Sequence, residues 1–113
     1  MKKKSLREKC DYIQVTTATA TETDARRIAT ALVEQRLAAC VQIEGPLEST
    51  YRWQGQIEQS QEWRCCAKTR DTLFAAVSQA IRQLHPYECP EILATPILAG
   101  SATYLAWLNA ELQ

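Results

Sequence analysis

The residues best suited to bind a metal ion lie close together in the second half of the sequence. His85 is the only histidine of the 113 residues, and the carboxylate of Glu88 and the thiol of Cys89 follow it. Imidazole, thiolate and carboxylate groups all serve as ligands of divalent metal ions. Because Pro86 and Pro90 exclude a helix, an extended chain would separate His85 from Cys89 by about 13 Å. The two share one ion only if the turn folds back or a neighbouring subunit contributes, and His85 can equally be a structural cap.

Catalytic chemistry has weaker support. A thiol nucleophile needs an oriented base, and the sequence identifies no group that would orient the single histidine. The three glycines are widely separated, which excludes a phosphate-binding loop. A carboxylate pair could come from four glutamates, although solvated positions explain them equally well: Glu58, Glu62, Glu88 and Glu91. We therefore expect a protein that is not an enzyme, with an enzyme using the same residues as a third alternative.

A second group of candidates combines aromatic side chains with charges. Such aromatic residues most often fill a core or an interface. The alternative is a cleft between subunits, where aromatic walls, an acid and a lysine would hold a small polar ligand together with His85. The residues of this predicted intersubunit cleft are Trp53, Glu62, Lys68, Tyr104 and Trp107.

The elements that must position these residues follow the order β-α-β-β-α-β-α. Helical spacing of apolar residues predicts a helix that starts at Thr21 to Asp24 and ends near Arg36, and a second helix between Asp71 and His85. Ser101 can cap a short last helix. Strands are predicted for residues 11–18, for 40–53 with an interruption at Gly45-Pro46, for 57–69 and for 92–98. The first six elements match the antiparallel, ferredoxin-like α+β fold, with both helices on one face of the sheet.

The two long central strands should form a hairpin around Gln54 to Gln56. A three-residue loop would place Trp53 opposite Ile57, whereas a two-residue loop would pair Trp53 with Gln56, a less favourable match. A hairpin of this length overhangs a four-stranded sheet. We expect its large side chains to lie on the face without helices and to be covered by a partner chain: Tyr51, Trp53 and Trp63.

Composition narrows the class of protein further. Thirteen basic residues balance thirteen acidic ones, so no long-range field favours nucleic acid or an anionic membrane surface. The length predicts one domain, residues 11–113, after a flexible basic tail over residues 1–10. Polar residues follow the basic start, unlike in a secretory signal, and no run approaches the roughly 18 apolar residues of a membrane span. A cytoplasmic protein is therefore expected.

The cysteine count agrees with a reducing compartment. Five thiols are an odd number, against a complete set of disulfides within the chain. Cys65 and Cys66 are neighbours in a predicted strand, so their side chains point to opposite faces. Without a C-x-x-C pair, neither a zinc knuckle nor a thioredoxin-type site is supported. We expect all five to be unpaired: Cys10, Cys40, Cys65, Cys66 and Cys89.

From about Tyr12 to Leu112 the sequence resembles the CutA divalent-cation-tolerance family. The residues that carry this resemblance are Leu37-Ala38-Ala39-Cys40, Tyr51-Arg52-Trp53-Gln54-Gly55-Gln56-Ile57-Glu58, Lys68-Thr69, His85-Pro86-Tyr87-Glu88-Cys89-Pro90-Glu91-Ile92 and Tyr104-Leu105-Ala106-Trp107-Leu108. The resemblance implies a homotrimer joined through the long hairpin strands and a role in tolerance to copper and other divalent ions. The family's fold resembles the trimeric PII signal proteins, so a PII-like sensor of a small organic or anionic ligand is the alternative function.

The resemblance does not transfer a complete copper site. In some bacterial members, copper is attributed to a cysteine of the first strand and to a His-His pair before the proline. The matching positions here are Thr17, Leu84 and His85, so only the last ligand is retained. The expected metal ligands are therefore His85 and, with weaker support, Cys89, with Cu²⁺ or another divalent ion as the bound species.

Overall fold

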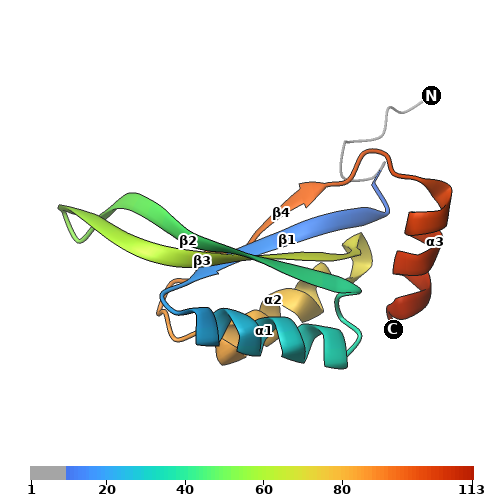
Figure 1. Cartoon of the computed structure of the whole chain (residues 1–113), viewed down its shortest axis with the longest axis horizontal. Helices are drawn as coiled ribbons and strands as arrows, with labels where there is room; N and C mark the ends of the chain where they lie inside the picture. Colours follow the sequence, from blue (N-terminus) through green and yellow to red (C-terminus); the bar gives the residue numbers. More distant parts are fainter. Residues whose placement is uncertain (1–9) are drawn as a thin grey trace.

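A computed structural model describes residues 10–113, and the order of its elements is the predicted one (Figure 1). Residues 1–9 of the predicted tail lie outside the described residues, and Cys10 is buried. The elements are β1 (Tyr12–Thr19), α1 (Glu22–Glu34), β2 (Cys40–Trp53), β3 (Gln56–Arg70), a short 3-10 helix (Asp71–Leu73), α2 (Phe74–Leu84), β4 (Leu93–Pro96) and α3 (Ala102–Glu111). The α+β class is confirmed.

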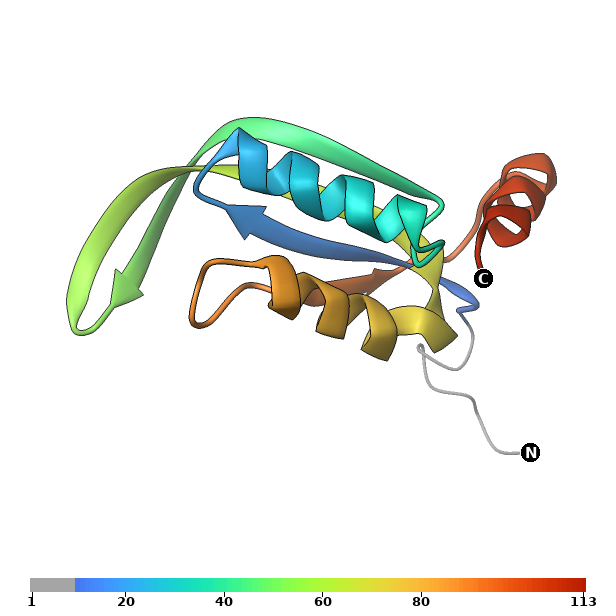
Figure 2. The same cartoon turned by 90° about the horizontal axis from the view of Figure 1, so that it is seen from below.

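The four strands form one antiparallel sheet in the order β2-β3-β1-β4. This is the strand order of the ferredoxin-like fold. Helices α1 and α2 lie side by side on one face of the sheet, and α3 stands at the end away from the hairpin tip (Figure 2). The core lies between this face and the two helices, and its buried residues are Ile13, Val15, Ile28, Leu32, Leu37, Ala38, Ala67, Val77, Ala80 and Ile81.

Local signals position the helix starts as predicted. The Thr21 hydroxyl accepts a hydrogen bond from the backbone N–H of Asp24, and Ser101 does the same for Tyr104. The buried residues of α1 are Ala25, Ile28 and Leu32, whereas Val33 near the helix end is 43% exposed. Strand β4 is shorter than the predicted 92–98. None of the helices over residues 10–113 is long and apolar enough to cross a membrane.

The turn of the hairpin differs from the prediction. Gln54 and Gly55 alone connect β2 to β3, and both have positive φ values of 50° and 79°. Two such residues form a type I′ turn, whose twist matches that of the flanking strands. Trp53 therefore lies opposite Gln56, and the predicted pairing with Ile57 is wrong. Pairing Trp53 with Ile57 would bury little apolar surface here, because the two residues are 44% and 67% exposed.

Trp63 also occupies a different face from the predicted one. Alternation along β3 places it on the same face as the buried Cys65, toward the helices. Its indole packs against Gly45, where a Cβ atom would collide with the ring. Glu22 and Arg26, at the start of α1, line one cavity together with Trp63 and Gly45. Trp63 is thus a half-buried residue that packs against β2 on the face of the sheet covered by the helices, and the prediction that it faces away from the helices is wrong.

Candidate functional site

His85 caps the end of α2 and is buried. Its Nε2 lies 2.7 Å from the carbonyl oxygen of Ala18 at the end of β1. Its Nδ1 accepts a 3.1 Å hydrogen bond from the backbone N–H of Tyr87. Because the carbonyl can only accept and the N–H can only donate, these contacts fit a neutral ring protonated at Nε2. They support the structural interpretation of His85, and binding a metal through this ring requires one of them to break.

Tyr87 is held in place from several directions. Besides the backbone contact with Nδ1, its ring centroid lies 4.6 Å from that of His85, at a tilt of 53°. Its phenol donates a 2.9 Å hydrogen bond to the carboxylate of Glu62 on β3. Burial, followed by this hydrogen bond to an anion, raises the pKa of the Tyr87 phenol above its usual value. Tyr87 therefore connects the loop after α2 to the base of the hairpin.

A cleft lies where this loop faces the hairpin. One part of it has a volume of about 390 Å³ and is lined by Ala18, Ser49, Thr50, Tyr51, Glu62, Tyr87, Cys89 and Glu91. An adjoining part of about 230 Å³ is lined by Tyr51, Trp53, Tyr87, Glu88 and Cys89. Three residues line both parts, so we treat them as one hairpin cleft. Its size is in the range of small-molecule sites.

The hairpin cleft contains several of the predicted ligand residues. The thiol of Cys89 is exposed there, beside a lining that includes Glu62, Glu88 and Glu91. His85 lies behind the cleft and does not line it. Over residues 10–113, no three His, Cys, Asp or Glu side chains are grouped closely enough to hold a metal ion. One chain therefore provides donors for a metal but not a complete coordination shell.

The remaining residues of the predicted intersubunit cleft gather elsewhere in the chain. The ammonium group of Lys68 lies 5.7 Å from the ring centroid of Tyr104 and donates a 3.0 Å hydrogen bond to Gln42. The rings of Tyr104 and Trp107 are 5.5 Å apart on α3. Six positions of β3, or about 20 Å of strand, separate Lys68 from Glu62. Within one chain, Trp53 and Glu62 therefore lie apart from Lys68, Tyr104 and Trp107. That the two groups meet between subunits stays a prediction.

Thr17 and Leu84, the positions that the resemblance matched to copper ligands, are buried and partly buried, respectively. Thr17 is 1% exposed, on the face of β1 that α1 and α2 cover, and its hydroxyl has no hydrogen-bond partner. Leu84 packs against the hydrophobic core at the end of α2. Neither side chain lines the hairpin cleft.

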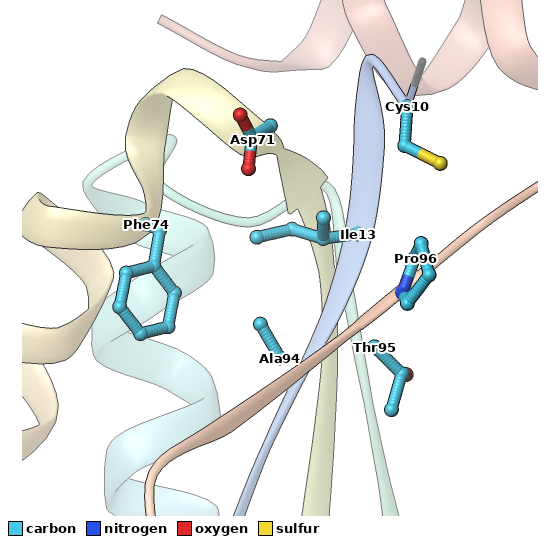
Figure 3. Close-up of a pocket in the computed structure, with 7 residues that line it drawn as sticks. All are labelled: Cys10, Ile13, Asp71, Phe74, Ala94, Thr95 and Pro96. Carbon is cyan, nitrogen blue, oxygen red and sulfur yellow. The ribbon is translucent and has the colours of Figure 1, made fainter. Parts of the chain in front are cut away.

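A second, mainly apolar pocket of about 300 Å³ lies at the opposite end of β1 from Ala18. Figure 3 shows Ile13 of β1 pointing toward Phe74 of α2 across this pocket, with Ala94 of β4 below them. The polar side chains in its lining are those of Asp71 and Thr95, besides the thiol of Cys10. It lies apart from the residues predicted to bind a ligand.

All five cysteines lie within the described residues and are free thiols. Burial, and to a lesser degree the neighbouring Cys66, raises the pKa of Cys65 to about 11. Burial also raises the pKa of Cys66, whose thiol donates to the side-chain oxygen of Gln14 at 2.8 Å. These two thiols are therefore poor nucleophiles, whereas Cys89 is the exposed one.

The sequence interpretation missed the part that Tyr87 plays. Its signal was present, because Tyr87 stands inside the motif that begins at His85. Contacts of Tyr87 with a histidine two residues away and with Glu62, 25 residues earlier, could not be read from spacing.

Comparisons with known proteins agree with this fold. The family model described as CutA1 divalent ion tolerance protein matches residues 13–111. The divalent-cation tolerance protein CutA of Thermus thermophilus is 49% identical over 85 residues, which are 75% of this chain and 82% of that protein. The solved Thermus thermophilus structure has a TM-score of 0.88 and is 43% identical, covering 90% of this chain and 99% of that one.

A solved protein of Archaeoglobus fulgidus, described as periplasmic divalent cation tolerance protein CutA, has a TM-score of 0.87 at 34% identity. The match covers 90% of this chain and 99% of the Archaeoglobus fulgidus chain. The family model spans almost all of the described residues, and the relatives share both sequence and strand arrangement. The chain belongs to the CutA1 divalent ion tolerance protein family.

Proposed function

We propose that the chain is a homotrimeric, cytoplasmic divalent-cation-tolerance protein that binds copper or another divalent metal ion and catalyses no reaction. Family membership over residues 13–111 supports the role in metal tolerance. The observation that supports direct binding of a metal ion is that Cys89 is exposed in a cleft lined also by three carboxylates. Zn²⁺ is bound in proteins by both thiolate and carboxylate groups, and thiolate ligands also suit copper in its Cu(I) state.

Cys89 is the stronger ligand candidate within one chain, because both ring nitrogens of His85 already have partners. A neighbouring subunit or water would complete the coordination shell, since one chain offers no group of three suitable side chains over residues 10–113. Binding should therefore be weaker than at a complete Cys-His-His site.

Calorimetric titration with Zn²⁺, which is redox-inert, and with Cu²⁺ tests this proposal. Cys89→Ser should lower the affinity by about tenfold or more, because it removes the thiolate ligand. Cys40→Ser is the matched control, a thiol outside the cleft, and should leave the affinity unchanged. Equal metal affinity in the wild type and in Cys89→Ser would contradict a site at this thiol.

The shape of the hairpin supports the trimer. Strands β2 and β3 have 14 and 15 residues, about two and a half times the usual length, and their tip projects beyond the rest of the subunit (Figure 1). Strand β2 ends the sheet, so its outer edge is free to pair with another chain. Light scattering should give three times the 12.8 kDa chain mass at all micromolar concentrations. A monomer under these conditions would exclude every site between subunits.

A second function, sensing of a small ligand in the hairpin cleft, is favoured by one specific observation. The cleft has aromatic walls, and its central residue, Tyr87, is held by His85 and Glu62 before any ligand binds. Such preorganised pockets are typical of small-molecule sites. Calorimetry with a nucleotide and small-ligand panel, in the absence of metal, distinguishes this function from metal binding.

A further inference from the structure

The charged side chains that line the hairpin cleft are all acidic. They are Glu62, Glu88 and Glu91, and neither part of the cleft has an Arg, Lys or His in its lining. The whole chain, in contrast, carries no net charge. Arg64 and Lys68 follow Glu62 on the same face of β3, but they lie outside both cavities. Within one chain, the lining of the cleft therefore carries negative charge only.

Aromatic side chains form the walls of this acidic region. Tyr51 and Trp53 stand on the same face of β2, each 44% exposed, and Tyr87 lies across from them in both lining sets. Aromatic faces attract cations electrostatically, and Trp and Tyr do so best. Carboxylates and aromatic faces in one cleft thus favour the same kind of ligand, one that carries positive charge on an organic skeleton.

The cleft is also formed before a ligand arrives. Glu62 fixes the phenol of Tyr87, and His85 fixes its backbone. The hydroxyl of Tyr51 lies 3.2 Å from that of Ser60, which orients the opposite wall. A preformed cleft loses little conformational entropy when it binds a small molecule.

From these observations we infer that the hairpin cleft binds a small organic cation, a molecule with an ammonium or guanidinium group. This inference rests on ligand sensing as the proposed function and names its ligand class. Glu91 and Glu62 accept hydrogen bonds from the cationic group, and the aromatic side chains contact the remainder of the molecule. Within one chain, an anionic ligand would meet three carboxylates and no counter-charge in the lining.

Calorimetric titration of the full chain at neutral pH, with EDTA present, tests this inference. The probes are agmatine, spermidine and choline as cations, and succinate and ATP as anions. At least one cation should bind saturably, and neither anion should bind. Glu91→Gln should weaken that binding about tenfold, because a charge-assisted contact is lost. Trp53→Ala should weaken it threefold or more.

Glu48→Gln is the matched control, because it removes one carboxylate from the opposite face of β2. It should leave cation affinity unchanged. The inference is overturned if no cation binds, if an anion binds instead, or if Glu48→Gln weakens binding as much as Glu91→Gln. Thermal melting of each variant confirms that it is folded, and Glu91 is exposed, so its replacement leaves the fold intact.

The two proposals fail independently. Metal titrations contain no amine, and amine titrations contain EDTA, so each result stands without the other. If Cys89→Ser lost Zn²⁺ binding but kept its affinity for the amine, the two ligands would be shown to depend on different residues of the cleft.

Discussion

The phenol of Tyr87 donates a 2.9 Å hydrogen bond to the carboxylate of Glu62, joining the loop after α2 to β3. Tyr87→Phe removes this bond and leaves the shape of the ring unchanged. We expect it to lower the free energy of unfolding by about 1.5–3 kcal/mol, the usual range for a hydrogen bond to a charged group. Urea denaturation measures the change. Tyr12→Phe is the control, and an equal effect of both variants would contradict the assignment.

His85 should stabilise the fold through both ring nitrogens. His85→Ala leaves the carbonyl of Ala18 and the N–H of Tyr87 without their partner, at a cost of about 2–4 kcal/mol. The amide of His85→Asn can replace Nδ1, and that of His85→Gln can replace Nε2, so each should cost less than the alanine. Urea denaturation of the three variants tests this order. Similar stability of the alanine variant and the wild type would show that neither contact matters.

The buried hydroxyl of Thr17 has no hydrogen-bond partner among residues 10–113, so we expect its removal to stabilise the fold. Thr17→Val keeps the shape of the side chain and removes a buried polar group without a partner. The free energy of unfolding should rise by about 1 kcal/mol. Thr19→Val is the matched control on the same face of β1, because the Thr19 hydroxyl donates a 2.7 Å bond to the carbonyl of Thr21. It should destabilise the protein, and thermal melts that shift in the same direction for both variants would refute the explanation.

Cys65 predicts a loss of stability at alkaline pH. Its thiol has a pKa of about 11 in the fold, against 9.0 as the ordinary value. Between these values the unfolded state loses a proton that the folded state keeps, so the free energy of unfolding falls as pH rises from 9 to 11. Cys65→Ala should show a shallower decline over this range. Parallel stability curves for the two proteins would show that the Cys65 thiol does not contribute.

Local patterns were sufficient to predict the elements and the fold class. Caps at Thr21 and Ser101 and the periodicity of apolar residues depend on neighbours within a few positions, so the sequence states them directly. The order of those elements then limited the topology to the ferredoxin-like sheet. The turn type at Gln54 was missed, because a positive φ in a residue other than glycine is uncommon and follows from the twist of the flanking strands.

Only the tertiary structure decided how the candidate site is built. The Ala18 carbonyl meets the His85 ring across 67 positions of sequence, and Lys68 lies about 20 Å along β3 from Glu62. The sequence identified Glu62, Cys89 and Glu91 as candidates, but strand register and the path of the loop after α2 placed them around one cleft. Contacts between residues far apart in the sequence depend on how the elements pack together, and this packing cannot be derived from the spacing of residues along the chain.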